Sequence, residues 1–223
     1  MKKSERAESL EISTRLMTEL VSFPISSVGN EGADLRSAVG KFLSNFSQLI
    51  VDHTIGTELF ACFEQARDAG ATIKSMNNVR AAMLKEVPAF PFGLSIVNAA
   101  IIFSFIEQSQ IITEIEFKSR GEASMIMDEM ALVIEEIKVN KADSFVSKDY
   151  QNFVGLAALL IQHLSATERQ LPRVVNYSFP IRLPALMLSN RIYGVGSRSD
   201  ELAEENKTVH PAFMQRDIIA LSS

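Results

Sequence analysis

The histidines of this chain are its first candidates for chemistry, because imidazole binds metals and transfers protons near neutral pH. His53, His163 and His210 are widely separated, and none has another histidine three or four positions away. A zinc site needs three or four ligands that converge on one point. The spacing therefore predicts no metal site, and the position of His210 before Pro211 favours a structural or surface role in a turn.

Cys62 is the only cysteine, so the chain has no internal disulfide, and an intracellular site of synthesis fits this usage. It lies in the apolar run Leu59–Phe63, which favours a buried, inert thiol over a reactive nucleophile.

Two pairs of adjacent carboxylates, Glu135–Glu136 and Glu204–Glu205, are candidates for acid–base work. Neighbours on a helix point about 100° apart, so neither pair shares one face, and solvated helix surface is the favoured interpretation. Gly194-Val-Gly196 lacks the further glycine and the preceding strand of a phosphate loop, so it predicts a helix stop. The sequence thus predicts no catalytic residue, no cofactor and no metal, and a protein that is not an enzyme.

Arginine and tyrosine side chains near the C-terminus are the candidate residues for binding a partner, since both types are enriched where interfaces carry their energy. They are Arg182, Arg191, Tyr193 and Arg198. In the alternative interpretation, Arg191 pairs with Asp200 or Glu201 and holds two short helices together. Both interpretations stay open at this point.

The methionines offer a second candidate surface, because methionine-rich faces adapt to partners. Met127 and Met130 match a core stripe with Ala131, Ile134 and Ile137, which favours packing. Met125 is the methionine to inspect if it lies outside that stripe.

Charge limits the kind of partner. The net charge is −5 and the pI about 5.3. Residues 1–169 hold 16 basic and 22 acidic side chains, and residues 170–223 hold 6 and 5. A protein that grips duplex DNA along a broad surface needs a basic stripe. The acidic balance argues against such binding by this chain alone.

One segment tests whether the chain spans a membrane. Residues 89–106 form an uncharged run of 18 residues, which is the minimum length for a membrane span. The run begins Ala-Phe-Pro-Phe-Gly, however, and includes the polar residues Ser95, Asn98 and Ser104. A core helix packed on all sides is the favoured interpretation, so no membrane span is predicted. The charged start, Met1-Lys-Lys-Ser-Glu-Arg6, is unlike a signal peptide.

The hydrophobic pattern predicts about seven helices in a helical domain of residues 1–169, with an interruption at 23–32. With 47% hydrophobic residues the chain can bury a substantial core. The predicted helices are Leu10–Leu20, Ala33–Ile50, Glu58–Ala69 stopped by Gly70, Met76–Glu86, Leu94–Phe117, Ala123–Val139 and Lys148–Ser165. Short connections between helices are typical of a multi-helix bundle.

The pattern changes after Leu171-Pro172, which predicts a small α+β module over residues 170–223. Arg173–Phe179 is β-branched and aromatic and predicts a strand. A helix from Pro184 to the stop at Gly194, a second helix capped by Ser199, and a closing strand at Gln215–Ser222 complete a strand-helix-helix-strand order.

Residues 182–223 resemble the C-terminal end of the DNA circularisation proteins of Mu-like bacteriophages and prophages. The resemblance covers about a fifth of the chain. It departs from the family pattern at Val195, where an acidic residue is usual, and at Lys207-Thr208. The matching positions are Leu183, Pro184, Leu188, Arg191, Tyr193, Gly194, Arg198, Asp200, Glu201, Leu202, Asn206, His210, Pro211 and Phe213. More loosely, the module resembles the LysM-like modules of phage tail and baseplate proteins, with Glu201–Asn206 similar to their second helix.

The resemblance implies a virion structural protein without catalysis, made in the bacterial cytoplasm and assembled into the phage tail. Family members carry a further N-terminal β-rich domain, so we expect this chain to be a part of a longer form. The implied partners are other tail and baseplate proteins, and a homo-oligomer is compatible with that role. An assembly protein should expose an apolar or aromatic patch.

Two alternatives remain open. A module that binds DNA ends and holds injected phage DNA in a circle would need clustered Arg and Lys. A hydrolase with an unrecognised site would need a deep pocket with titratable groups of shifted pKa.

Overall fold

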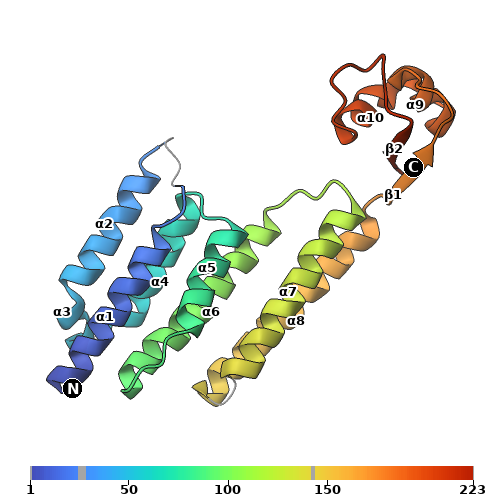
Figure 1. The fold of residues 1–223 in the computed structure, drawn as a ribbon. Coiled ribbons are helices and arrows are strands. Elements are labelled where there is room, and N and C mark those ends of the chain that lie inside the picture. The colour runs from blue at the N-terminus through green and yellow to red at the C-terminus, as the bar shows by residue number, and fades with distance from the viewer. Residues whose placement is uncertain (1, 25–28, 142–143, 223) are drawn as a thin grey trace. The chain divides into compact units, whose positions relative to one another are not determined.

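Helices make up most of the computed structural model, which describes residues 2–24, 29–141 and 144–222 (Figure 1). A small antiparallel sheet of β1 (Val174–Ser178) and β2 (Asp217–Leu221) lies near the C-terminus. The predicted fold class, a mainly helical bundle followed by a small α+β module, is confirmed. The helices are α1 (Lys3–Leu20), α2 (Glu31–Ser44), α3 (Phe46–Val51), α4 (Ile55–Asp68), α5 (Ile73–Leu84), α6 (Pro91–Thr113), α7 (Arg120–Lys141), α8 (Ser147–Gln170), α9 (Ala185–Tyr193), the short 3₁₀ helix η2 (Gly196–Arg198) and α10 (Ser199–Glu205).

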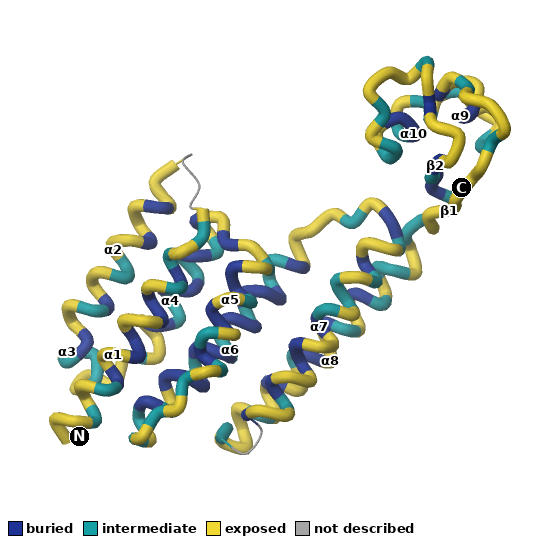
Figure 2. Tube along the Cα trace, viewed as in Figure 1, coloured by how far each residue is buried: buried dark blue, intermediate teal, exposed yellow. Residues whose placement is uncertain are grey.

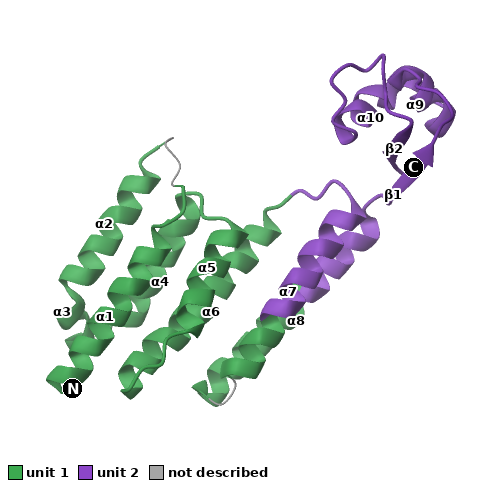
Figure 3. Ribbon diagram, in the orientation of Figure 1, with its two compact units in different colours: residues 1–115, 134–160 green, residues 116–133, 161–223 purple. Residues whose placement is uncertain are grey.

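The chain divides into two compact units (Figure 3). The first, residues 1–115 with 134–160, is the helical unit, and the second, residues 116–133 with 161–223, contains the α+β module. The division runs through α7 and α8, and residues 170–223 fall wholly in the second unit. The predicted domain boundary between residues 169 and 170 stays a prediction.

Within the described residues, the helical part contains one more helix than predicted, because the range 33–50 is broken at Asn45. This residue ends α2 and precedes α3, with φ −97° and ψ 6°. Asparagine competes with the helix for backbone hydrogen bonds and therefore favours helix ends. Phe42 and Phe46, on either side of the break, are both buried, with ring centroids 6.0 Å apart. Of the predicted interruption at 23–32, residues 25–28 lie outside the described residues.

Two helix ends follow from local sequence. Gly70 follows α4 with φ +94°, and the N–H of Ala71 donates to the carbonyl of Ala66, so the predicted glycine stop is confirmed. Before α7, the Ser119 hydroxyl accepts the Glu122 N–H at 3.4 Å, and the Glu122 carboxylate accepts the Lys118 N–H at 2.8 Å. The Ser119–Glu122 motif that interrupts the long apolar pattern therefore begins the next helix.

α6 forms the centre of the helical unit. It contacts α1, α4 and α5, and every residue from Ile96 to Ile112 is buried or half-buried (Figure 2). Among the described residues, α6 alone is long and apolar enough by length and composition to cross a membrane, with a mean hydropathy of 1.4. Within that apolar window 56% of the residues are buried, as expected for a core helix.

Two polar side chains of α6 are buried and bind arginines. The Glu107 carboxylate is fully buried and lies 3.0 Å from the Arg67 guanidinium of α4. Burial raises the pKa of Glu107, and Arg67 opposes this shift. At the next position, the Gln108 side-chain oxygen accepts a hydrogen bond at 2.9 Å from Arg80 of α5. Buried charges need such partners, so these bonds fix which faces of α4 and α5 meet α6.

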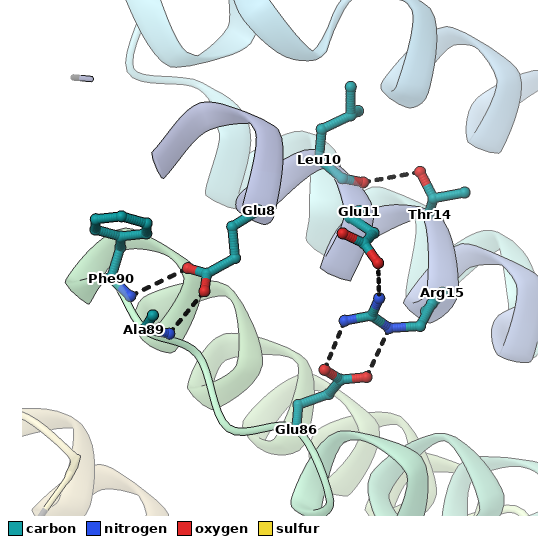
Figure 4. Close-up of polar contacts among 8 residues, drawn as sticks. All are labelled: Glu8, Leu10, Glu11, Thr14, Arg15, Glu86, Ala89 and Phe90. Carbon is teal, nitrogen blue, oxygen red and sulfur yellow. Dashed lines mark hydrogen bonds and ion pairs between the residues drawn. The ribbon is translucent and has the colours of Figure 1, made fainter. Parts of the chain in front are cut away.

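A second set of polar contacts joins α1 to the chain before α6 (Figure 4). The Glu8 carboxylate accepts the N–H groups of Ala89 at 2.7 Å and Phe90 at 3.1 Å, which precede α6. Arg15 donates two hydrogen bonds to Glu86, at 2.8 and 2.7 Å. A negative charge beside unpaired N–H groups stabilises the start of a helix. Phe90, the residue at the N-cap of α6, has no side chain that could accept such a hydrogen bond, so the Glu8 carboxylate of α1 takes this role.

The α+β module has its own small core. β1 pairs antiparallel with β2, and α9 and α10 lie between them in sequence, which confirms the predicted element order. Gly194 ends α9 with φ +74°, as predicted for a helix stop. Ser199 is already helical with φ −63° and ψ −38°, so its predicted role as the cap is wrong, because η2 leads directly into α10. The buried core residues are Ala185, Leu188, Leu202, Ala203, Met214, Ile218 and Ala220.

Removing Arg67 tests the buried ion pair. We expect Arg67→Ala to lower the free energy of unfolding at pH 7 by about 3 kcal/mol, since it leaves the Glu107 charge buried without its partner. In a Glu107→Gln background the same change should cost clearly less. Urea unfolding of the four proteins measures both, and equal costs in the two backgrounds would contradict the pair.

The same variants test the pKa of Glu107. Because its folded pKa lies above the ordinary value of 4.5, the folded protein binds the proton more tightly. Its contribution to stability is therefore greatest below 4.5 and declines as pH rises through the raised pKa. We expect Glu107→Gln to remove that decline in urea midpoints recorded against pH.

Candidate functional site

A surface pocket of about 730 Å³ lies on the α+β module. Its lining combines positive charge with exposed apolar groups. Arg182, Lys207 and Arg216 bring three cations, and Val209 and Phe213 bring the apolar surface. We call this the cationic pocket. The other lining residues are Thr208, His210, Gln215 and Asp217.

Lys207 reaches the pocket because the chain reverses after α10. It has φ +46°, a left-handed conformation that glycine usually takes at a helix end. The N–H of Thr208 donates to the carbonyl of Ala203 at 3.0 Å and closes the helix. A lysine in this conformation costs about 1 kcal/mol, so the cation is placed here at the expense of local stability.

The segment after Lys207 forms one wall. The N–H of Phe213 donates to the carbonyl of His210 at 3.0 Å, which confirms the predicted turn at His210-Pro211. The His210 ring lies 5.7 Å from the Phe213 ring, and its Nδ1 accepts the N–H of Ala212 at 3.1 Å. The Phe213 side chain is nevertheless 68% exposed, and Val209 is fully exposed. The turn therefore presents apolar groups to solvent beside the cations.

Asp217 is the single carboxylate among the lining residues, and it is already engaged. The Ser178 hydroxyl donates to it at 2.7 Å. Three cations facing one occupied carboxylate leave an excess of positive charge, although the module as a whole is nearly balanced. The pocket is thus suited to a ligand that has a negative group next to an apolar one.

The structure distributes the predicted partner-binding residues over three places. Arg182 lines the cationic pocket. Arg198 lies over the Tyr193 ring at 3.9 Å and makes two hydrogen bonds to Glu201, at 2.9 and 2.6 Å. Arg191 is exposed and lies over the Phe179 ring at 5.5 Å. The alternative pairing of Arg191 with Asp200 or Glu201 is wrong, because Arg191 lies over the Phe179 ring and the Glu201 carboxylate binds Arg198.

These contacts also decide the chemistry of the Arg198 cluster. The Glu201 hydrogen bonds raise the pKa of Arg198, and burial raises the pKa of Tyr193 against the opposing effect of Arg198. A guanidinium held by both a carboxylate and a ring serves to fix two helices together. Of the four predicted residues, Arg182 and Arg191 keep exposed charged groups for a partner.

The side chain of Asn206, at the end of α10, both donates to and accepts from the backbone of β2. Its side-chain oxygen accepts the N–H of Ile219, and its amide donates to the carbonyl of the same residue, both at 2.8 Å. The amide also donates to the carbonyl of Leu202 at 2.8 Å. Asn206 therefore takes the place of a neighbouring strand along the outer edge of β2.

Met125 lies outside the buried stripe of α7. It is 73% exposed, whereas Met130, Ile134 and Ile137 are buried. Met127 is half-buried, and Ala131 is exposed, so its predicted core position is wrong. Leu132, one heptad after Met125, is equally exposed. Met125 and Leu132 are thus apolar groups that the helical packing leaves in solvent.

The remaining candidates for chemistry have structural positions. Cys62 is buried, as predicted, and burial raises its pKa to about 12, whereas the inertness of its thiol stays a prediction. His53 has φ +57° in the turn that ends α3, and His163 is exposed on α8. Residues 2–24, 29–141 and 144–222 include no group of three His, Cys, Asp or Glu suited to a metal ion. Cys62 and Glu107 are closed to substrates, so their shifted pKa values lend no support to a hydrolase.

No protein-family model matches the chain, and no curated protein matches its sequence.

Sequence reasoning missed Lys207, Arg216 and Phe213 as members of one pocket. They lie on three successive segments: the end of α10, the turn after it, and the residue before β2. Two local signals were present: Lys207-Thr208 departs from the pattern of the DNA circularisation proteins, and Phe213 is one of the positions that match it.

Asn206 offers a direct test of how the module is closed. We expect Asn206→Ala to lower the free energy of unfolding of the module by about 2–3 kcal/mol, because three hydrogen bonds are lost at about 1 kcal/mol each. The Ile219 amide should then exchange faster with deuterium. Asn190→Ala, on the exposed surface of α9, is the control and should change stability by about 0.5 kcal/mol or less.

Proposed function

We propose that the chain is a non-enzymatic virion protein of the DNA circularisation family of Mu-like phages and prophages. In this proposal it is made in the bacterial cytoplasm, enters the phage tail, and acts in tail or baseplate assembly through protein–protein contacts. The family assignment rests on the sequence resemblance of residues 182–223. The role in assembly rests on the surface of the module.

The cationic pocket is the observation that carries the proposal. Binding sites between proteins are enriched in arginine and aromatic residues at their centre. Here Arg182 and Arg216 lie in one pocket with Phe213, whose ring stays 68% exposed although the module has a complete core next to it. An aromatic side chain that the fold does not bury is available to a partner.

The charge of the helical part supports a protein partner rather than duplex DNA. Residues 1–169 carry six more acidic than basic side chains. A DNA duplex would meet repulsion from this part, and the pocket offers three cations in place of a stripe along the backbone. A partner with an acidic and apolar segment suits the pocket better.

A matched pair of valines tests the assembly role. Val209 and Val87 are both almost fully exposed, so replacing either with serine should change folding stability by about 0.5 kcal/mol or less. Val209 lines the pocket, and Val87 lies in the loop between α5 and α6. In the phage that encodes the chain, we expect Val209→Ser combined with Phe213→Ser to reduce tailed particles about tenfold or more, since a lost interface anchor costs about 2 kcal/mol.

Electron microscopy and mass spectrometry of purified particles give the readout. Val87→Ser should leave tails at the wild-type level. Normal tails that still contain the pocket variant would contradict the assembly role.

DNA-end binding is the second candidate, and the excess of cations in the pocket is the observation that favours it. A salt titration with linear double-stranded DNA separates the two. We expect little binding even at low salt. Binding whose logarithm falls with log salt by about 0.9 for each phosphate contact, with a slope that Arg216→Gln reduces by about one, would instead establish the DNA role.

A further inference from the structure

The two outer edges of the small sheet differ. The side-chain amide of Asn206 occupies the outward N–H and C=O of Ile219, the middle residue of β2. All five residues of β1, by contrast, are exposed. An open strand edge is a template for another strand, and proteins usually protect such edges. In this module one edge is closed by a side chain and the other is open.

The hydrogen bonds at the ends of the ladder show which groups of β1 face that open edge. The N–H of Ser222 donates to the carbonyl of Arg173 at 2.7 Å, and the N–H of Phe179 donates to the carbonyl of Arg216 at 2.9 Å. Bonded and non-bonded pairs alternate along an antiparallel ladder. Val175 and Tyr177 are therefore bonded to β2, and the N–H and C=O of Val174, Asn176 and Ser178 point outward.

We propose that β1 pairs with β1 of a second copy of this chain, antiparallel and centred on Asn176. In this register Val174 lies opposite Ser178 of the second copy, and Asn176 lies opposite its counterpart. Every outward N–H and C=O of β1 then meets a matching group. A shift to any other centre leaves some of them unpaired.

The side chains of β1 are compatible with this partner. The strand reads Val-Val-Asn-Tyr-Ser and carries no charge, so no like charges face each other. Val175 falls opposite Tyr177 of the second copy, a β-branched and aromatic pair that stabilises sheets. Arg173, the charged residue next to the strand, falls opposite Phe179 of the second copy rather than opposite another arginine.

The closed edge explains why a second copy is favoured over an unlimited series of strands. Pairing through β1 gives a four-stranded sheet whose outer strands are the two β2 strands. Both outer edges carry Asn206 at their middle residue. The assembly therefore stops at two chains related by a two-fold axis, as in most closed homo-oligomers. The inference goes beyond the proposed function, since it stands on the backbone geometry of the sheet and needs no phage partner.

The test is the solution mass of the full chain and of Asn176→Pro, measured by light scattering from low to several hundred micromolar chain. Proline removes the outward N–H of residue 176 and no bond to β2, and proline is tolerated on the outward side of an edge strand. We expect the wild-type mass to approach twice the 24.7 kDa of one chain, and the variant to stay at 24.7 kDa. Asn176→Ser keeps the N–H and should behave as the wild type.

Two further measurements guard against a variant that simply misfolds. Asn176→Lys places like charges opposite each other in the dimer, so we expect a monomer at low salt whose dimerisation recovers as salt rises. In amide exchange, Val175 and Tyr177 should be protected in monomer and dimer, and Val174, Asn176 and Ser178 only in the dimer. A wild-type chain that stays monomeric, or a dimer that Asn176→Pro leaves intact, would overturn the pairing. Either result leaves the particle experiment with the pocket variants to decide the assembly role separately.

Discussion

The helical unit depends on one constraint: α6 is apolar around its whole circumference and has to be covered on every side. Water cannot solvate such a helix favourably, so α1, α4 and α5 pack against it, and every residue from 96 to 112 is buried or half-buried. Hydrophobic burial has no direction, and it does not select which faces meet. Glu107 and Gln108 supply that selection, because each needs a partner inside the core and finds an arginine on a different helix. Gly93 allows a close approach near the start of α6, where an added Cβ would lie only 3.0 Å from Glu8 and 3.1 Å from Ile12 of α1.

The α+β module has a small core of seven buried residues, so hydrophobic burial contributes less to its stability than in the helical unit. Polar contacts of defined geometry stabilise it in addition. Arg198 joins α9 to α10 through Glu201 and the Tyr193 ring, and Asn206 joins α10 to β2 through the backbone of Ile219. With few side chains needed inside, the module leaves Phe213, Val209 and three cations at its surface. Because so few side chains are needed in this core, β1 is also exposed along its whole length.

Much of the fold was predictable because it is local. Apolar spacing located the helices, Gly70 and Gly194 marked two helix stops, and the β-branched segment after Pro172 marked the first strand. The break at Asn45 was missed because the apolar spacing continues across it: Phe42 and Phe46 are four positions apart, as on one face of a single helix, and both are buried. The candidate site was predicted in part: Arg182 lies in the pocket, whereas Arg198 has a structural contact.

The sequence by itself determined the composition of the chain's surfaces: an acidic helical part, an arginine-bearing module and one helix without a polar face. These properties depend on residue type and on spacing within one element, which a linear reading preserves. Only the tertiary structure decided that Lys207, Phe213 and Arg216 share a pocket, that Arg198 lies over the Tyr193 ring of α9, and that Asn206 closes one edge of the sheet. Each of these depends on where one element places a side chain against another, and that placement follows from packing of the whole module rather than from any short segment.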